Sequence, residues 1–132
     1  WLEFYAWHEA INRGLADEQH CQWGCTIIDG SDKKELDLAL MSKSQLFMAE
    51  CKTEQNPFNT NHLHKLKAKA DLLGGNYVYK FFVTNQYEGG RNINDFCDLA
   101  KRYQIVVITG EKLPGFAQIL AKELEKPTYP GI

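Results

Sequence analysis

Two apolar segments separated by four polar residues limit the folds open to this chain more than any other feature of its sequence. The segments cover residues 35–41 and 46–53, and the link at 42–45 is short enough for a β-hairpin. We expect one face of the two strands to carry Leu36, Leu38, Leu40, Phe47, Ala49 and Cys51. The opposite face is also apolar over part of its length. Strands that are apolar on both faces are central strands of a sheet covered on both sides.

The rest of the chain alternates between helical and strand patterns. Apolar spacing predicts helices over 2–12, 60–73, 93–103 and 113–124, and further strands over 21–29, 77–84 and 105–108. The order helix, three strands, helix, strand, helix, strand, helix indicates an α/β fold. Antiparallel strands open its mixed sheet, βαβ crossovers add parallel ones, and helices cover both faces. We expect a single domain over residues 1–132, near the commonest domain size.

Composition and charge narrow the class of protein. The formal net charge is −2 and the isoelectric point is near 6.1. Proteins that coat nucleic acid by charge alone are usually basic, so any contact with nucleic acid should be local. No apolar run is long enough for a membrane helix, no signal peptide is visible, and the four cysteines match no zinc spacing. We expect a reduced, cytoplasmic protein, and because it opens without an initiator Met, the C-terminal part of a longer one.

Three charged side chains interrupt the apolar hairpin. If Lys43 and Ser44 form a two-residue turn, Asp37 lies directly across from Glu50, and Lys52 follows on the same face. The turn lacks the Asn-Gly signature, and a slip of one residue would separate the charges. Charged groups on central strands are costly unless they are paired or bind a metal ion. Two acids that repel each other also need a cation between them.

This arrangement predicts metal-dependent chemistry. Carboxylate oxygens favour Mg²⁺ or Mn²⁺ over zinc. Such an ion can polarise a phosphate and lower the pKa of a bound water, while Lys52 orients that water or stabilises the charge on the phosphate. The expected reaction is hydrolysis of phosphodiester bonds in nucleic acid. The alternative is a buried ion pair, in which Lys52 neutralises Glu50 or Asp37 within a fold that has no activity.

The hairpin motifs and their position between two helices resemble those of the PD-(D/E)xK nuclease superfamily. More narrowly, Glu35-Leu36-Asp37 and Ala49-Glu50-Cys51-Lys52-Thr53 are similar to motifs of one group within it. This group is the C-terminal nuclease domain of CARF-fused CRISPR ancillary nucleases of the Card1 or Can2 type. The opening Trp1-Leu2-Glu3 and the later Gly74-Gly75 also resemble that group. One departure is that Leu36 stands where the superfamily motif has proline.

The resemblance implies a restriction-endonuclease-like fold in which Asp37, Glu50 and the Cys51 carbonyl hold Mg²⁺ or Mn²⁺. Lys52 would be the catalytic lysine. Glu3 would be the additional acid that many such nucleases use, although a solvated helix acid is the alternative. The resemblance further implies a homodimer, an N-terminal CARF domain that senses a cyclic oligoadenylate, and single-stranded DNA or RNA as substrate in antiviral defence.

Three basic side chains are candidates for contact with substrate phosphates. Lys65 and Lys69 share a face with His62 on the helix predicted over 60–73, and a plain solvated face is the alternative interpretation. Arg91 is the third candidate, and a surface salt bridge is the simpler role for it. Two other functions stay open for the whole chain. One is a catalytically inactive interaction or dimerisation module on a nuclease scaffold, and the other is nucleic-acid binding without cleavage.

Overall fold

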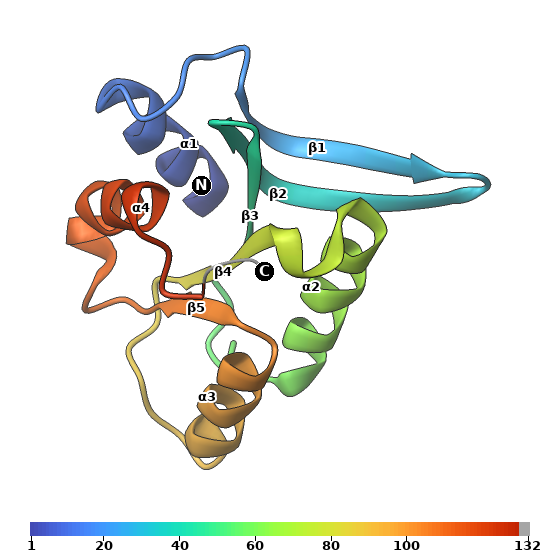
Figure 1. Cartoon of the computed structure of the whole chain (residues 1–132). Coiled ribbons are helices and arrows are strands. Elements are labelled where there is room, and N and C mark those ends of the chain that lie inside the picture. Colours follow the sequence, from blue (N-terminus) through green and yellow to red (C-terminus); the bar gives the residue numbers. More distant parts are fainter. Residues whose placement is uncertain (130–132) are drawn as a thin grey trace.

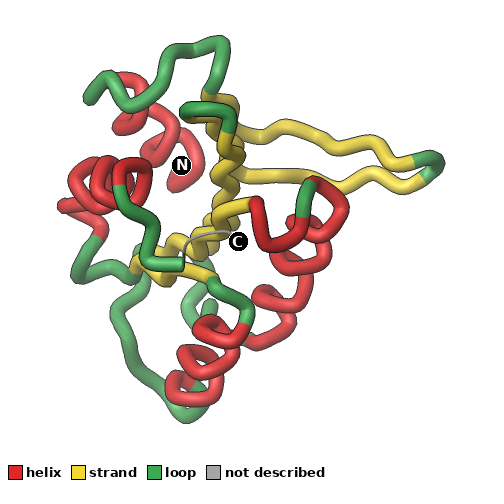
Figure 2. Tube along the Cα trace, viewed as in Figure 1, coloured by secondary structure: helices red, strands yellow, loops and turns green. Residues whose placement is uncertain are grey.

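A five-stranded mixed sheet forms the centre of the protein, as the sequence predicts (Figure 1, Figure 2). The structure is a computed structural model and describes residues 1–129, apart from the side chains of Asp29 and Asn76. The strand order is β1-β2-β3-β4-β5. The antiparallel strands are β1 (Cys21–Asp29), β2 (Asp32–Ser42) and β3 (Gln45–Lys52). β4 (Val78–Thr84) and β5 (Ile105–Ile108) continue the sheet in parallel with β3.

Two pairs of helices cover the two faces of the sheet. α1 (Leu2–Asn12) and α4 (Phe116–Glu125) enclose one apolar core, and α2 (Thr60–Leu73) and α3 (Ile93–Arg102) enclose the other. Two short 3₁₀ helices, η1 (Gly75–Tyr77) and η2 (Leu113–Gly115), precede β4 and α4. No helix within residues 1–129 is long and apolar enough to cross a membrane.

The β2–β3 hairpin has the expected register. Ser42 pairs with Gln45, and the ladder continues to the pair of Leu38 with Ala49. Lys43 and Ser44 form the turn with φ angles of 51° and 65°. Positive φ at both central residues is what a type I′ turn requires, and its twist matches that of the flanking strands. The register prediction is confirmed, although neither turn residue is the usual Asn or Gly.

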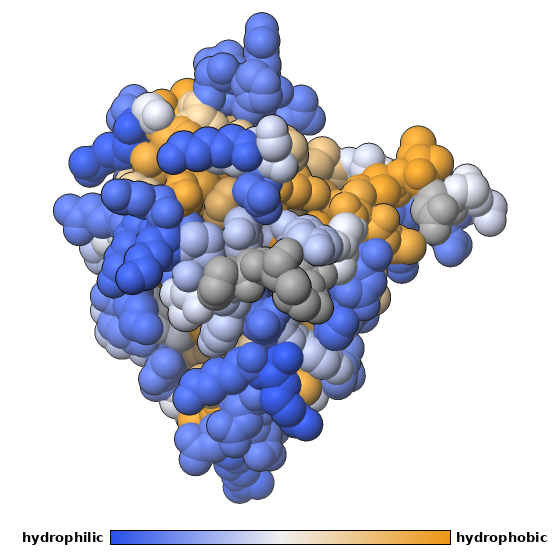
Figure 3. Space-filling view, in the orientation of Figure 1, coloured by the Kyte–Doolittle hydropathy of each residue, from blue (hydrophilic) through white to orange (hydrophobic). Residues whose placement is uncertain are grey.

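The β1–β2 hairpin changes faces near its middle, which the sequence did not predict. Leu38 packs in the core beneath α1, whereas Leu36 packs in the core beneath α2. Residues two apart on a regular strand share a face, so the prediction that Leu36 and Leu38 lie together is wrong. Gly24 on β1 has a φ of +63°, a local kink of the kind that glycine permits. Beyond this point the hairpin projects from the body, and its visible face is largely apolar (Figure 1, Figure 3).

The cysteines belong to the packing of this fold. All four are free thiols, and Cys21 and Cys51 are buried. Burial raises the pKa of the Cys21 thiol to about 11. A thiol that stays protonated near neutral pH is a weak nucleophile and packs as a small apolar group.

Candidate active site

Asp37 lies where strands β2 and β3 stop pairing. The last backbone pair between them is Leu38 with Ala49; Leu38 comes one residue after Asp37 on β2, and Ala49 comes one residue before Glu50 on β3. The Asp37 Oδ2 atom accepts a hydrogen bond of 2.8 Å from the backbone N–H of Cys51. The Asp37 side chain therefore provides the hydrogen-bond acceptor for the Cys51 N–H, which lies beyond the last backbone pair of the ladder. This bond fixes the Asp37 carboxylate against the end of β3.

The Asp37 carboxylate lies in surroundings that disfavour its charge. Burial is the largest cause that raises its pKa, and repulsion from Glu50 and Glu3 raises it further. The Cys51 N–H bond and the Lys52 ammonium oppose this rise in pKa. A buried acid that nearby acids repel is stabilised by a cation. Groups with such perturbed pKa values are frequent in functional sites.

Glu50 is buried and engaged by two lysines. Its side chain is 10% exposed, and its Oε2 atom lies 3.1 Å from Lys69 Nζ on α2. Its Oε1 atom lies 3.7 Å from Lys52 Nζ on its own strand. A buried carboxylate is tolerated when it is paired in this way. The charge of Glu50 is therefore compensated within the protein, and that of Asp37 much less so.

Lys52 is the last residue of β3 and is more accessible than Glu50. Its side chain is 30% exposed. Cys51 separates it from Glu50 in the sequence, and the Cys51 carbonyl is therefore part of the same strand end. The structure thus brings Asp37, Glu50 and Lys52 together, although the predicted pair of Asp37 with Glu50 lies one step beyond the last pair of the ladder.

Glu3 joins the group from a distant part of the sequence. It lies in the first turn of α1, next to the fully buried Leu2. Its charge contributes to the raised pKa values of both Asp37 and the Cys51 thiol. Glu3 therefore acts electrostatically on these groups, and its role as the additional acid that the resemblance implies stays a prediction.

The donor chemistry of this group suits a hard divalent cation, although its side chains alone do not form a complete cage. Within residues 1–129, no three His, Cys, Asp or Glu side chains lie close enough together to hold a metal ion. Asp37 and Glu50 with the Cys51 carbonyl nevertheless offer three oxygen donors of the type that Mg²⁺ and Mn²⁺ prefer. These residues are chemically suited to bind such an ion. Glu50 would have to give up its contact with one lysine when the ion binds.

Comparison with known proteins places the whole chain in a family. The family model described as the Card1-like endonuclease domain matches residues 1–126, nearly the whole chain. The chain belongs to this family. Family membership supports nuclease activity in this Card1-like domain and agrees with the motifs on β2 and β3. No curated protein sequence matches the chain.

Several solved structures are similar to this Card1-like domain. Protein VC1899 from Vibrio cholerae matches with a TM-score of 0.77 and 22% identity over 100% of this chain and 35% of that chain. Can2 from Sulfobacillus thermosulfidooxidans, in complex with cyclic tetra-adenylate, matches with a TM-score of 0.73 and 15% identity over 94% of this chain and 33% of that chain. Protein AF1548, of unknown function, matches with a TM-score of 0.55 and 16% identity over 80% and 57% of the respective chains. The first two neighbours confirm the fold, and this chain spans about a third of their length.

The three basic residues predicted to contact substrate occupy different environments in the Card1-like domain. Lys69 reaches Glu50, as described above. Lys65 is exposed, one turn earlier on α2. Arg91 is exposed in the loop between β4 and α3, and no carboxylate among the described side chains lies within 4 Å of it. The structure therefore brings one of the three to the acids and leaves the other two at the surface.

A contact between Glu54 and His62 lies beside this group of residues, and the sequence alone did not predict it. The His62 Nε2 atom lies 3.3 Å from Glu54 Oε1, and the His62 side chain is only 15% exposed. The His62 ring stacks on Phe82, whose backbone pairs with that of Glu50. Charged residues occupy every second position at Glu50, Lys52 and Glu54, and this pattern is visible in the sequence. His62 is thus a half-buried partner of the loop after β3.

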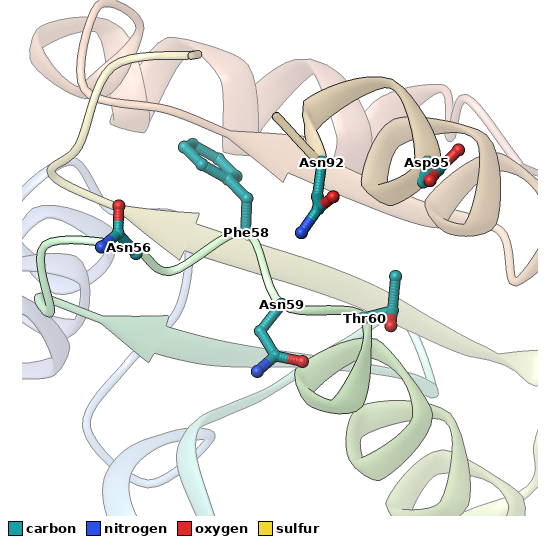
Figure 4. A pocket seen from close by; sticks show the side chains of 6 residues that line it. All are labelled: Asn56, Phe58, Asn59, Thr60, Asn92 and Asp95. Carbon is teal, nitrogen blue, oxygen red and sulfur yellow. The ribbon is translucent and has the colours of Figure 1, made fainter. Parts of the chain in front are cut away.

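A polar hollow opens between the first turns of α2 and α3 (Figure 4). Its volume is about 440 Å³, and its lining residues are Asn56, Phe58, Asn59, Thr60, Asn92 and Asp95. Asn92 and Thr60 point toward one another across it (Figure 4). The hollow follows the carboxyl ends of β3 and β4, the edge of the sheet where Lys52 pairs with Thr84. No motif in the sequence predicts this hollow.

Proposed function

We propose that this Card1-like domain is a metal-dependent endonuclease that hydrolyses phosphodiester bonds in nucleic acid. The observation that carries the proposal is the meeting of Asp37, Glu50 and Lys52 at the end of β3. Family membership supports the reaction class. The identity of the ion and the roles of single residues rest on the chemistry of the group.

Asp37, Glu50 and the Cys51 carbonyl would hold Mg²⁺ or Mn²⁺, with Glu3 as a further acid nearby. The ion would polarise the scissile phosphate and lower the pKa of a bound water. Lys52 is the partly exposed cation of the group. Its ammonium donates a hydrogen bond to a phosphate oxygen or orients the attacking water, and so stabilises the negative charge that develops.

The substrate and partners form a further part of the proposal. We infer that the substrate is single-stranded DNA or RNA, with Lys65, Lys69 and Arg91 as contacts for its phosphates. The domain acts in CRISPR-type defence in the cytoplasm as part of a homodimer, under the control of a separate domain that senses a cyclic oligoadenylate. The similarity to Can2, whose structure contains cyclic tetra-adenylate, supports such a sensor.

The proposal is tested with labelled single-stranded DNA and RNA, incubated with the protein in Mn²⁺ or in EDTA. The Lys52→Ala variant is the informative comparison. Lys33→Ala is the matched control, because Lys33 is exposed on β2 near the tip of the β1–β2 hairpin. We expect cutting in Mn²⁺ by the wild type and by Lys33→Ala, and a loss of cutting in EDTA and in Lys52→Ala. Equal cutting by Lys52→Ala would exclude it as the catalytic lysine.

One observation favours a second candidate, a catalytically inactive interaction module on the same scaffold. The Glu50 carboxylate is already neutralised by Lys69 and Lys52, as expected of a structural ion pair. Metal binding separates the two candidates. An inactive module shows no rise in melting temperature with Mn²⁺, whereas the proposed enzyme shows a rise that disappears in Asp37→Ala.

A further inference from the structure

The ion pair between Lys69 and Glu50 links the outer helix α2 to the proposed metal site. The 3.1 Å contact joins residues that lie on different elements, and both side chains are largely buried, at 15% and 10% exposure. Lysines are seldom buried unless they are paired. The pair therefore has a specific geometry and is not a chance contact at the surface.

Lys69 differs from its neighbours on the same helix. Lys65 is exposed, and Lys67 forms an ion pair with Asp71, one turn further along α2, at 3.0 Å. Only Lys69 among these three reaches the acids of β3. The apolar face of α2, which contains Leu63, Leu66 and Ala70, determines this orientation by packing against the sheet.

The position of Lys69 conflicts with a metal ion on Glu50. Lys69 Nζ lies near one carboxylate oxygen and Lys52 Nζ near the other. A divalent cation bound to either oxygen would lie a few ångströms from an ammonium. In a partly buried site the repulsion between like charges is only weakly screened. The Lys69–Glu50 ion pair and a metal ion on Glu50 therefore oppose each other.

We propose that Lys69 is a built-in counter-ion, which neutralises Glu50 in the metal-free protein and is displaced when the metal ion binds. This inference rests on the proposed function, because it needs a metal ion at Glu50. It assigns to Lys69 an effect on metal affinity: the ion pair weakens binding. Once displaced, the ammonium is free to approach an anionic group of the substrate.

Mn²⁺ affinity, measured by calorimetric titration without nucleic acid, tests this inference. Lys69→Met removes the charge and keeps a side chain of similar length. We expect it to bind Mn²⁺ about tenfold more tightly or better, since the ion no longer competes with an ammonium. Lys69→Arg keeps the charge and should bind Mn²⁺ as weakly as the wild type. Lys65→Met, the matched control on the exposed side of α2, should also match the wild type.

Melting curves in EDTA give a second measurement that does not depend on activity. Lys69→Met should melt at a lower temperature than Lys65→Met because it leaves Glu50 with one cation. If Lys69→Met does not fold, Lys69→Gln replaces it, since its amide can still donate a hydrogen bond to Glu50 without a charge. Unchanged or weaker Mn²⁺ affinity in the folded neutral variant overturns the inference alone. If the wild type shows no Mn²⁺ binding that depends on Asp37, the inference and the proposed function both fail.

Discussion

The side chain of Asp37 and the backbone of Cys51 are joined by a hydrogen bond of 2.8 Å at the point where the β2–β3 ladder ends. The bond gives Asp37 two separable roles. One is structural, because its Oδ2 atom satisfies the N–H of Cys51. The other is electrostatic, because its charge lies among those of Glu50 and Glu3.

Substitution of Asp37 by Asn separates these roles. The amide oxygen of Asp37→Asn can still accept the Cys51 N–H, but the negative charge is lost. We expect loss of Mn²⁺-dependent cutting together with an unchanged or increased free energy of unfolding, by up to about 1 kcal/mol, because the repulsion from Glu50 and Glu3 disappears. Asp37→Ala also leaves a buried N–H without its partner and should be less stable than Asp37→Asn by about 1 kcal/mol or more. Urea unfolding and a cutting assay measure both effects, and an active Asp37→Asn would remove Asp37 from the metal site.

Lys80 is a buried cation that the proposed chemistry does not use. It lies in the middle of β4, is 3% exposed, and no carboxylate among the described side chains lies within 4 Å of it. Lys80→Met keeps the volume and removes the charge. We expect it to raise the free energy of unfolding by about 1 kcal/mol in urea at pH 7, because an unpaired buried charge is costly. Lys65→Met, on the surface of α2, should change it little, and a marked destabilisation by Lys80→Met would show that the ammonium has a partner.

The pKa of Lys80 predicts how the free energy of unfolding depends on pH. Burial lowers the pKa of Lys80, the nearby Lys67 lowers it further, and Asp71 partly opposes this. A lowered folded-state pKa means that the unfolded chain binds the proton more tightly. The resulting cost is fully present below the folded-state pKa and disappears as the pH rises toward the unfolded value of about 10.4. The stability gap between Lys80→Met and the wild type should therefore be widest at pH 7 and narrow by pH 10, and a gap independent of pH would contradict this assignment.

The hairpin was predictable because its signals are local. The apolar alternation and the four-residue polar link fix the β2–β3 register, and the charged residues then follow by counting. The change of face between Leu36 and Leu38 was not predictable in this way. It depends on the left-handed conformation of Gly24, on a different strand, and on the core that each leucine finds.

The contact of Lys69 with Glu50 was likewise not predictable from the sequence. Helical periodicity places Lys69 and His62 on one face of α2, but periodicity does not show what that face covers. Only the packing of the helix against the sheet shows that Lys69 meets Glu50 and that His62 meets Glu54. The acids on β2 and β3 were therefore predictable from sequence, and the side chains that approach them from α2 were not.

The residues of the β2–β3 turn are not the most favourable ones for its conformation, so substitutions that stabilise the turn test the register directly. Lys43 and Ser44 have positive φ angles, a conformation that costs about 1–2 kcal/mol for ordinary residues and little for glycine. Lys43→Asn combined with Ser44→Gly should raise the free energy of unfolding by about 1 kcal/mol, measured in urea. Ser44→Ala, which keeps a Cβ atom at the same φ, should give no gain. A destabilised double variant would show that the turn has another conformation.

Gly110 lies far from the acids in the sequence, and a substitution there should destabilise the protein severely. It follows β5 and donates its N–H to the Gln86 carbonyl at 2.8 Å. A Cβ atom at Gly110 would lie 2.3 Å from the Asn85 carbonyl oxygen and 2.8 Å from Tyr87 Cδ1. The clash with backbone cannot be relieved by a side-chain rotation, so Gly110→Ala should lower the free energy of unfolding by about 2 kcal/mol or more.

Gly89 provides the matched control for Gly110, because a Cβ atom there would meet nothing within 4 Å and its φ is not positive. Gly89→Ala should change the free energy of unfolding by no more than about 0.5 kcal/mol. Both glycines affect the loop that carries Arg91. Gly89 lies within this loop, and the hydrogen bond from Gly110 holds the start of the loop at Gln86. If Arg91 contacts substrate, Gly110→Ala should weaken the binding of single-stranded nucleic acid in EDTA, measured by fluorescence anisotropy below its melting temperature. Gly89→Ala should leave that binding unchanged. Equal binding by both variants would show that the position of this loop does not matter for the substrate.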